Sequence, residues 1–554
     1  MAAVQVNVPA LLEVLRKRRT EIQVKSLKEL LIKYVADCIP RSDDLTHGTI
    51  KLENLPLTIR KEVLDQLMGM RHKGDVDHHF QKRIDRVIEA YAQLISPDTK
   101  KIDLSGLISW CSQENVSKNI TKALEVISAK AVCLEHLDLS FPEYTTFDRI
   151  QNSFLDDNSI RAILGMENLK IIRFSLVEYI PLKRICKNLQ KLQYVECEFL
   201  QFSGVEDIEA DIEDLKLSFS RLRVFLYGGF KHSFAQLLIQ HLPNLYMVRD
   251  FDDILHFNST FEELPIPAET SELRVMYTAP TTIDLPAKFP NVTHLNANCV
   301  EVEPENQHDS ILRFTRIESL ALNIQPFPST LNSFLDAYGA NLHTLMIRSG
   351  RTSSLKFSFQ RIFDACPNLQ KLTLTCVKIS DDRQPLKSFA QLRELDWTPD
   401  SINDEFVVTN ILAAPNLQKF SLSCNHSEMS ARNLQKLTSL VAEKKILSKL
   451  TSLSLNFCDC IEQEVVVDIN YEFLRALRDL VAVSAVHLPN LIDFKLGMCF
   501  EEYSETICIQ SNLEYDLHYV FGRKFQDWIE DDSIVEFILA FNARKHPNLT
   551  VQVW

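Results

Sequence analysis

Residues Cys366–Cys376 read CPNLQKLTLTC, and the spacing in this stretch decides the fold. Leu372 and Leu374 are two residues apart, so a strand would turn both side chains to one face and the residues between them to the other. Just upstream, residues 357–365 have the apolar spacing of a short amphipathic helix, which Pro367 would stop. The unit is therefore a helix, a turn and a strand. It cannot bury its apolar face alone, so it needs stacked copies on either side.

The same spacing, an apolar residue followed three and five positions later by two more, recurs along the chain. Good copies start at Leu134, Leu169, Leu189, Leu222, Ile317, Leu342, Leu369, Leu392, Leu417, Leu450 and Leu491, and weaker ones at Leu245, Leu273, Val292 and Leu549. The period varies from roughly 20 to 35 residues. The pattern resembles the leucine-rich-repeat superfamily from about Val132 to Trp554. This resemblance implies an α/β fold, a solenoid with a curved parallel sheet and helices on the convex side.

The composition restricts the possible partners and the cell compartment. The 554 residues carry a formal net charge of −14, which argues against a general nucleic-acid or anionic-membrane binder, because neutralising phosphates needs a cationic face. No apolar run has the length of a membrane span, and no signal-like segment opens the chain. The 13 cysteines are scattered, as expected of free thiols in a reducing compartment. We therefore expect a cytoplasmic or nuclear protein, or one present in both compartments.

Two helical stretches precede the repeats. Residues 26–39, SLKELLIKYVADCI, have a continuous apolar helical face, and residues 54–68, NLPLTIRKEVLDQLM, place a proline in the first turn of a second helix. We expect residues 1–100 to form an all-helical N-terminal cap. The repeat array then occupies residues 101–554, with an irregular insert at about residues 501–528.

Residues 26–39 resemble the BC-box by which substrate receptors of cullin-2 ubiquitin ligases bind elongin C. Leu27 matches the anchoring leucine, Val35 the small apolar position and Ile39 the last apolar position of that motif. Leu31 stands where the family usually has cysteine. The resemblance implies elongin B and elongin C as partners, with Leu27, Leu31, Val35 and Ile39 as the binding residues.

Residues 55–67 are similar to the cullin-2 box, in which an apolar residue and a proline are followed by two free positions and another apolar residue. The similarity implies that Pro56, Ile59 and Val63 contact cullin-2. The same stretch also fits the opening of a divergent F-box. A third possibility is that both helical stretches only cap the repeat array.

The outward strand positions of the early repeats are unusually apolar for a solvated face. They include Ile171, Arg173, Val195, Val224 and Leu226. Because contiguous exposed apolar residues mark interaction sites, we expect a protein substrate to bind here. The sequence does not identify that substrate.

Motifs that carry catalysis are missing from the sequence. We find no phosphate-binding glycine-rich loop, no G-x-S-x-G, no HExxH and no paired CxxC, and the chain has only 12 glycines. The cluster of His72, His78 and His79 lacks metal-ligand spacing, so we expect a solvated segment. The sequence therefore predicts an adaptor without enzymatic activity, cofactor or metal. It docks elongin and cullin-2 through its N-terminal helices and a substrate through its repeats, or serves as an interaction scaffold outside any ligase.

Overall fold

The computed structural model describes residues 32–36, 39–40, 52–70, 80–112, 114–140, 155–202, 212–228, 232–250, 270–278, 284–299, 311–324, 328–349, 355–379, 386, 389–399, 408, 410–424, 429–457, 471–491, 493–500, 505–510 and 550–553. These residues fall into two compact units. The first unit comprises the described parts of residues 24–276 and 284–292. The second comprises those of residues 277–283 and 293–554. Each unit is described by itself.

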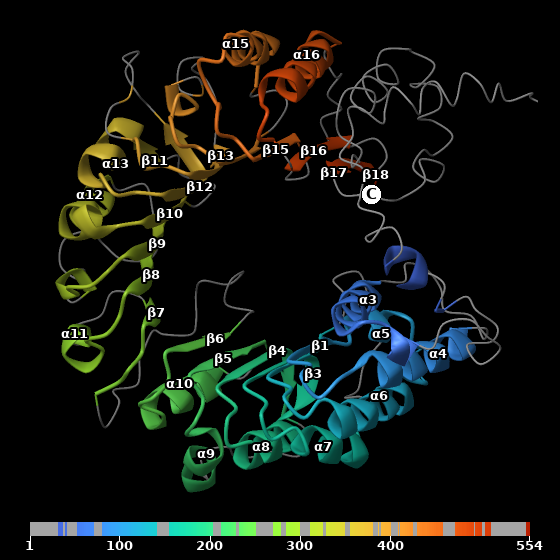
Figure 1. The fold of residues 1–554 in the computed structure, drawn as a ribbon. Coiled ribbons are helices and arrows are strands. Elements are labelled where there is room, and N and C mark those ends of the chain that lie inside the picture. Colours follow the sequence, from blue (N-terminus) through green and yellow to red (C-terminus); the bar gives the residue numbers. More distant parts are fainter. Residues whose placement is uncertain are drawn as a thin grey trace, which may run out of the picture. The chain divides into compact units, whose positions relative to one another are not determined.

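The first unit contains a six-stranded parallel sheet in the order β1-β2-β3-β4-β5-β6. Its strands are β1 (Lys101–Asp103), β2 (His136–Leu139), β3 (Ile171–Glu178), β4 (Tyr194–Gln201), β5 (Val224–Tyr227) and β6 (Met247–Asp250). Its helices after β1 are α5 (Ser105–Ser109), α6 (Val116–Lys130), α7 (Asp157–Leu164), α8 (Tyr179–Asn188), α9 (Ile212–Phe219), α10 (His232–His241) and α11 (Leu285–Lys288). Helices α6 to α9 lie along one face of the sheet, and no described helix covers the opposite face (Figure 1).

The remaining strands form a twelve-stranded sheet in which β8 to β16 are parallel. Its strands are β7 (Val275–Thr278), β8 (His294–Cys299), β9 (Ser319–Ile324), β10 (Thr344–Ser349), β11 (Leu355–Phe357), β12 (Lys371–Ile379), β13 (Glu394–Pro399), β14 (Lys419–Ser423), β15 (Ser452–Phe457), β16 (Asp493–Phe500), β17 (Glu505–Gln510) and β18 (Thr550–Val553). The helices are η5 (Ile311–Arg313), α12 (Pro328–Tyr338), η6 (Gly339–Asn341), α13 (Phe359–Ala365), α15 (Ala431–Ala442) and α16 (Tyr471–His487). Helices α12, α13, α15 and α16 again lie along one side (Figure 1).

One inward residue per strand builds the core at each level. In the first sheet Ile102, Leu137, Ile172, Val195 and Phe225 are register partners on successive strands, and all are fully buried. Leu345, Leu372, Leu395, Phe420 and Leu453 form the equivalent row of the second sheet. Each buried leucine or phenylalanine contributes about 1.5–3 kcal/mol relative to an exposed one. The fold is a leucine-rich-repeat array, as the sequence predicts.

An asparagine before the strand ties neighbouring repeats together. The side-chain amide Nδ2 of Asn168 donates to the carbonyl oxygen of Val132 at 2.8 Å, and that of Asn368 donates to Ala340 at 2.9 Å. Asn416 makes the same bond to Ala390 at 2.6 Å. The turn that precedes many strands therefore also satisfies a carbonyl of the previous repeat, which explains why asparagine recurs there.

The N-terminal helices η1 (Leu52–Asn54), α3 (Leu57–Gly69) and α4 (Phe80–Leu94) pack beside the first strand. The guanidinium of Arg60 on α3 donates to the carbonyl oxygen of Gln93 at 2.7 Å and to those of Leu94 and Ile95 at 3.3 Å, which caps the C-terminal end of α4. The backbone N–H of Asp103 on edge strand β1 donates to Sδ of Met68 at 3.2 Å. An exposed strand edge invites pairing with other chains, and α3 covers part of this one.

The end of the array departs from the repeat pattern. Residues 505–510, within the stretch expected to be an irregular insert, form β17, which pairs antiparallel with β16. The final strand β18 pairs antiparallel with β17 and supplies the last edge of the sheet. The sequence predicts a strand at the end of the chain but not its antiparallel pairing.

Candidate protein-binding face

The uncovered face of the first sheet displays two rows of outward side chains, which we call the first open face. The lower row consists of Lys101, His136, Ile171, Tyr194 and Val224, and the upper row of Asp103, Asp138, Arg173, Glu196 and Leu226. Adjacent strands in a sheet are about 4.8 Å apart, so each row is a continuous line of neighbouring side chains.

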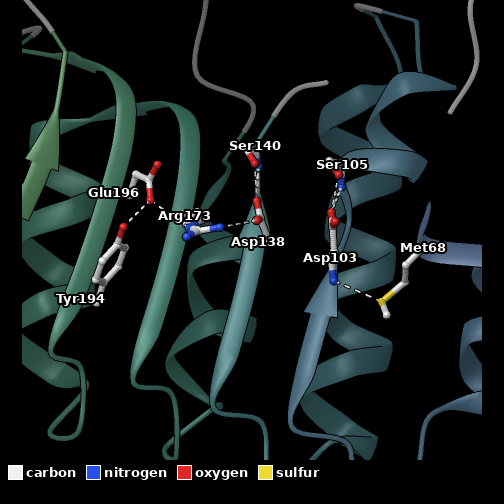
Figure 2. Close-up of polar contacts among 8 residues, drawn as sticks. All are labelled: Met68, Asp103, Ser105, Asp138, Ser140, Arg173, Tyr194 and Glu196. Atoms are coloured by element: carbon white, nitrogen blue, oxygen red, sulfur yellow. Dashed lines mark hydrogen bonds and ion pairs between the residues drawn. The ribbon is translucent and has the colours of Figure 1, made fainter. Parts of the chain in front are cut away.

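Arg173 is the centre of a polar network on this face (Figure 2). Its Nε lies 2.9 Å from Oε2 of Glu196 on β4, and its Nη1 lies 3.6 Å from Oδ2 of Asp138 on β2. The hydroxyl of Tyr194 donates to the same Glu196 oxygen at 2.6 Å, and the Arg173 guanidinium lies over the Tyr194 ring at 5.8 Å. Burial lowers the pKa of Arg173, but the charge of Glu196 and further contacts with Tyr194 and Asp138 outweigh it, so the pKa is raised overall. The Arg173 guanidinium therefore stays charged, and together with Glu196 it holds Tyr194 in place.

Serines fix the aspartates of strands β1 and β2, Asp103 and Asp138, which lie to the right of Arg173 in Figure 2. The backbone N–H of Ser140 donates to Oδ1 of Asp138 at 3.0 Å, and that of Ser105 donates to Oδ1 of Asp103 at 2.8 Å; each serine hydroxyl also donates to the same oxygen (Figure 2). In both repeats the serine lies two residues after the aspartate, so the bonds are a local turn motif. They position the carboxylates before any partner arrives.

His136 adds a neutral group to the lower row. Burial lowers its pKa, and the positive charges of Lys101 and Arg173 lower it further. Its Nε2 is buried and has no hydrogen-bond partner among the described residues. The imidazole is therefore disfavoured as a cation at neutral pH.

The structure corrects one predicted residue of this face. Val195 is fully buried, so the prediction that it points outward is wrong. The strand of this repeat begins at Tyr194, and Leu192, Val195 and Cys197 are its inward residues. The sequence pattern starting at Leu189 is offset by three positions, because Leu189 and Leu192 are both buried before the strand begins. Ile171, Arg173, Val224 and Leu226 lie on the open face, half-buried, as predicted.

Sequence reasoning missed Tyr194 and Glu196 as outward residues of the same strand. A usable signal was present: if small apolar residues are accepted, Leu192-x-x-Val195-x-Cys197 fits the repeat spacing as well as the offset copy does. Accepting it turns Tyr194 and Glu196 outward.

The predicted docking residues fall into three groups. Leu27 and Leu31 lie outside the described residues. Val35 and Ile39 are buried by this chain, whereas Tyr34, which directly precedes Val35, is 68% exposed. The aromatic side chain of this segment is therefore exposed to solvent, whereas the two aliphatic side chains are not.

Among the three predicted cullin contacts at and after the start of α3, exposure decreases in sequence order. Pro56 is exposed, Ile59 is half-buried and Val63 is fully buried. Leu57 in the first turn is 54% exposed. The start of α3 is therefore available to a partner, while Val63 supports the helix from inside.

The described residues contain no group of three or more His, Cys, Asp or Glu side chains that could hold a metal ion, and His72, His78 and His79 lie outside them. No described helix combines the length and the apolar character that a membrane crossing requires.

Comparison with known proteins gives only distant likenesses. No protein-family model and no curated protein matches the chain. Among solved structures, the crystal structure of the Rad7 and Elc1 complex in yeast is similar over 78% of this chain and 96% of that chain, with 14% identity and a TM-score of 0.39. A complex of TLR13 with ssRNA13 is similar over 83% of this chain and 58% of that chain, with 15% identity and a TM-score of 0.23. Both TM-scores lie below 0.5, so neither likeness bears on function.

Proposed function

We propose that this chain is a non-catalytic, cytoplasmic or nuclear adaptor that recognises the substrate of a cullin–RING ubiquitin ligase. In this proposal the N-terminal helices dock elongin C, with elongin B, and cullin-2, while the first open face binds the protein to be ubiquitinated. The chain then accelerates ubiquitin transfer by holding the substrate near the ligase rather than by chemistry of its own.

The observation that carries the proposal is the first open face. Half-buried Ile171, Tyr194, Val224 and Leu226 lie beside fixed charges on Asp138, Arg173 and Glu196. Aromatic and arginine anchors surrounded by apolar area are typical of residues that contribute most to protein interfaces. A sheet face that only contacts water needs neither such anchors nor the apolar area around them.

The docking half rests on the BC-box and cullin-2-box resemblance and on the exposure of the first turn of α3. Pro56 and Leu57 are open to solvent, and Ile59 is partly so. Because Val63, Val35 and Ile39 are buried in this chain, we assign cullin contact to the start of α3. We keep Leu27 as the elongin anchor.

A second candidate is an interaction scaffold outside any ligase, in which α3 and α4 only cap the array. The contacts of Arg60 with the end of α4 and of Met68 with the edge of β1 favour a capping role. Docking uses the exposed start of α3 and capping uses the residues from Arg60 onward, so the two roles are compatible. A divergent F-box remains the third possibility, with another cullin in place of cullin-2.

Affinity purification of the tagged full-length chain from cells tests the proposal. We expect elongin B, elongin C and cullin-2 to co-purify. Leu27→Ala should lose all three, and Pro56→Ala with Ile59→Ala should keep the elongins and lose cullin-2.

A matched pair of leucines provides the control. Leu57→Asp should lose cullin-2, whereas Leu217→Asp on α9, where the leucine is 56% exposed, should retain every ligase subunit. Absence of the elongins from the wild-type purification would reject the ligase assignment in favour of the scaffold.

A further inference from the structure

In the first unit, the residues that directly precede the strands also form backbone hydrogen bonds from repeat to repeat. They extend the hydrogen-bond ladder of the parallel strands at the N-terminal ends of those strands. The N–H of Arg223 donates to the carbonyl oxygen of Gln193 at 2.8 Å, that of Tyr246 to Arg223 at 2.7 Å, and that of Arg274 to Tyr246 at 2.8 Å. Arg223, Tyr246 and Arg274 are therefore direct neighbours in three consecutive repeats. We call these three residues the arginine rim.

Within the arginine rim, two guanidinium groups lie over one tyrosine ring. The Cζ of Arg223 is 5.0 Å from the centre of the Tyr246 ring, and the Cζ of Arg274 is 4.4 Å from it. Nη1 of Arg223 also donates to the carbonyl oxygen of Asn244 at 2.9 Å. Each cation–π contact contributes about 0.5–1 kcal/mol at an exposed site, and together they restrict the motion of both arginines.

Neither arginine has a carboxylate within salt-bridge distance among the described residues. Earlier in the same row the charges are matched, since Lys170 lies 2.7 Å and Lys100 3.4 Å from carboxylate oxygens of Glu135. The arginine rim thus holds two fixed, unneutralised positive charges on a protein whose net charge is −14.

We propose that the arginine rim binds an acidic segment of a partner protein, one with clustered Asp or Glu side chains. A guanidinium presents a planar fork of N–H donors that matches a carboxylate with two parallel hydrogen bonds. Because the tyrosine already holds both forks, binding costs less side-chain entropy than it would for two free arginines.

Nucleic acid fits this surface less well than a carboxylate-rich peptide. Bases bind proteins largely by stacking on aromatic rings, and the Tyr246 ring is in contact with two guanidinium groups. The overall negative charge also repels a long polyanion, whereas a short acidic segment meets mainly the local field. This inference does not depend on ligase membership, because the arginine rim shares no residue with the first open face or with α3.

Fluorescence anisotropy with the purified full-length chain tests the inference. The probes are a fluorescein-labelled oligoglutamate peptide and a labelled oligothymidylate of equal charge, each at low and at physiological salt. We expect the chain to bind oligoglutamate, with affinity falling as salt rises. Arg274→Glu should weaken this binding about tenfold or more, since truncation or reversal of an anchoring charge has effects of this size.

Arg393→Glu is the matched control, because Arg393 is an exposed arginine at the equivalent ladder position of the second unit, where its N–H donates to Gln370 at 2.8 Å. This variant should bind oligoglutamate like the wild type. Tyr246→Leu should weaken binding without changing the charge. Thermal melting of each variant shows whether the fold is kept, and Arg223→Gln with Arg274→Gln serves as a milder variant that should lose binding as well.

Three results would overturn the inference. They are no oligoglutamate binding by the wild-type chain, equal weakening by Arg393→Glu and Arg274→Glu, and tighter binding of oligothymidylate than of oligoglutamate.

Discussion

Equivalent outward positions on the two sheets carry different chemistry. The first open face holds Ile171, Tyr194, Val224 and Leu226 around the charges centred on Arg173. At its outward positions, which also include Ala321, Met346 and Asp396, the second sheet holds many small hydroxyl and amide side chains. These are Ser319, Asn323, Thr344, Thr373, Ser421, Ser423, Ser452, Ser454 and Asn456, to which Lys371, Glu394 and Lys419 add an ion-paired line.

The inward residues of both sheets obey the same rule, since buried apolar side chains fill the matched levels, most of them leucine, isoleucine, valine or phenylalanine. Folding therefore constrains the inward positions alike and leaves the outward ones free to differ. Hydroxyl and amide groups stay hydrated at little cost, so the second face needs no partner. Covering half-buried aromatic and aliphatic groups with a partner is favourable, and this is why we propose the first open face as the binding surface.

The largest expected effect distinguishes inward from outward positions within the first unit. Val195→Asp should destabilise this unit by about 4 kcal/mol or more, because it places an unpaired carboxylate in the core. Val224→Asp, at an outward position, should cost only about 1 kcal/mol. Urea denaturation followed by far-ultraviolet circular dichroism measures both. Equal losses would mean that the inward and outward assignments of β4 or β5 are wrong.

A second prediction compares one glycine substitution in each of the two units. A Cβ added at Gly339 would clash with the carbonyl oxygen of Ala365 in the next repeat, whereas one added at Gly69 meets nothing within 4 Å. Gly339→Ala should therefore destabilise the second unit by about 1–3 kcal/mol through overpacking. Gly69→Ala is the control and should not lower stability in this way.

Differential scanning calorimetry compares these two glycine variants. If the first open face alone binds the partner, Gly339→Ala should leave partner binding unchanged although it lowers the stability of the second unit. A Gly339→Ala variant that melts like Gly69→Ala would show that the two repeats are not packed as closely as the backbone indicates.

Removing an ion pair from each of the two faces should change stability by less than the substitutions above. Arg173→Ala removes the partner of Asp138, which is buried, and of Glu196, and should cost about 1 kcal/mol, a value kept low because water reaches the guanidinium. Lys419→Ala removes an exposed lysine beside Glu394 and should leave the melting temperature unchanged. A double-mutant cycle with Glu196→Ala measures the coupling directly. Zero coupling between Arg173 and Glu196 would show that the network does not order the first open face.

Much of the fold follows from the sequence, because a period-two alternation of apolar residues in many copies determines strands, sheet and core together. The offset at Val195 arose because Leu189 and Leu192 have the same three-residue spacing as the strand motif. Local spacing does not reveal which of two overlapping copies is the strand. The antiparallel pairing of β17 with β16 was not predicted because residues 501–528 carry no repeat.

The candidate sites were predictable in part. Four of the five residues predicted to point outward lie on the first open face, because outward positions follow from the strand register; their binding of a substrate stays a prediction. The burial of Val35, Ile39 and Val63 depends on which helices pack together, which a helical pattern alone does not determine. The arginine rim was also missed, since Arg223, Tyr246 and Arg274 are far apart in sequence and meet only when the repeats stack.

Quantitative affinity purification of two matched double variants tests the central claim most directly. Val224→Asp with Leu226→Asp alters the first open face, and Thr373→Asp with Ser421→Asp alters the second, while both pairs leave the N-terminal helices unchanged. The account predicts that the first pair loses the proteins captured by the repeat array and keeps elongin B, elongin C and cullin-2, and that the second pair keeps all of them. Loss of the captured proteins only in the second pair, with both variants folded, would contradict it.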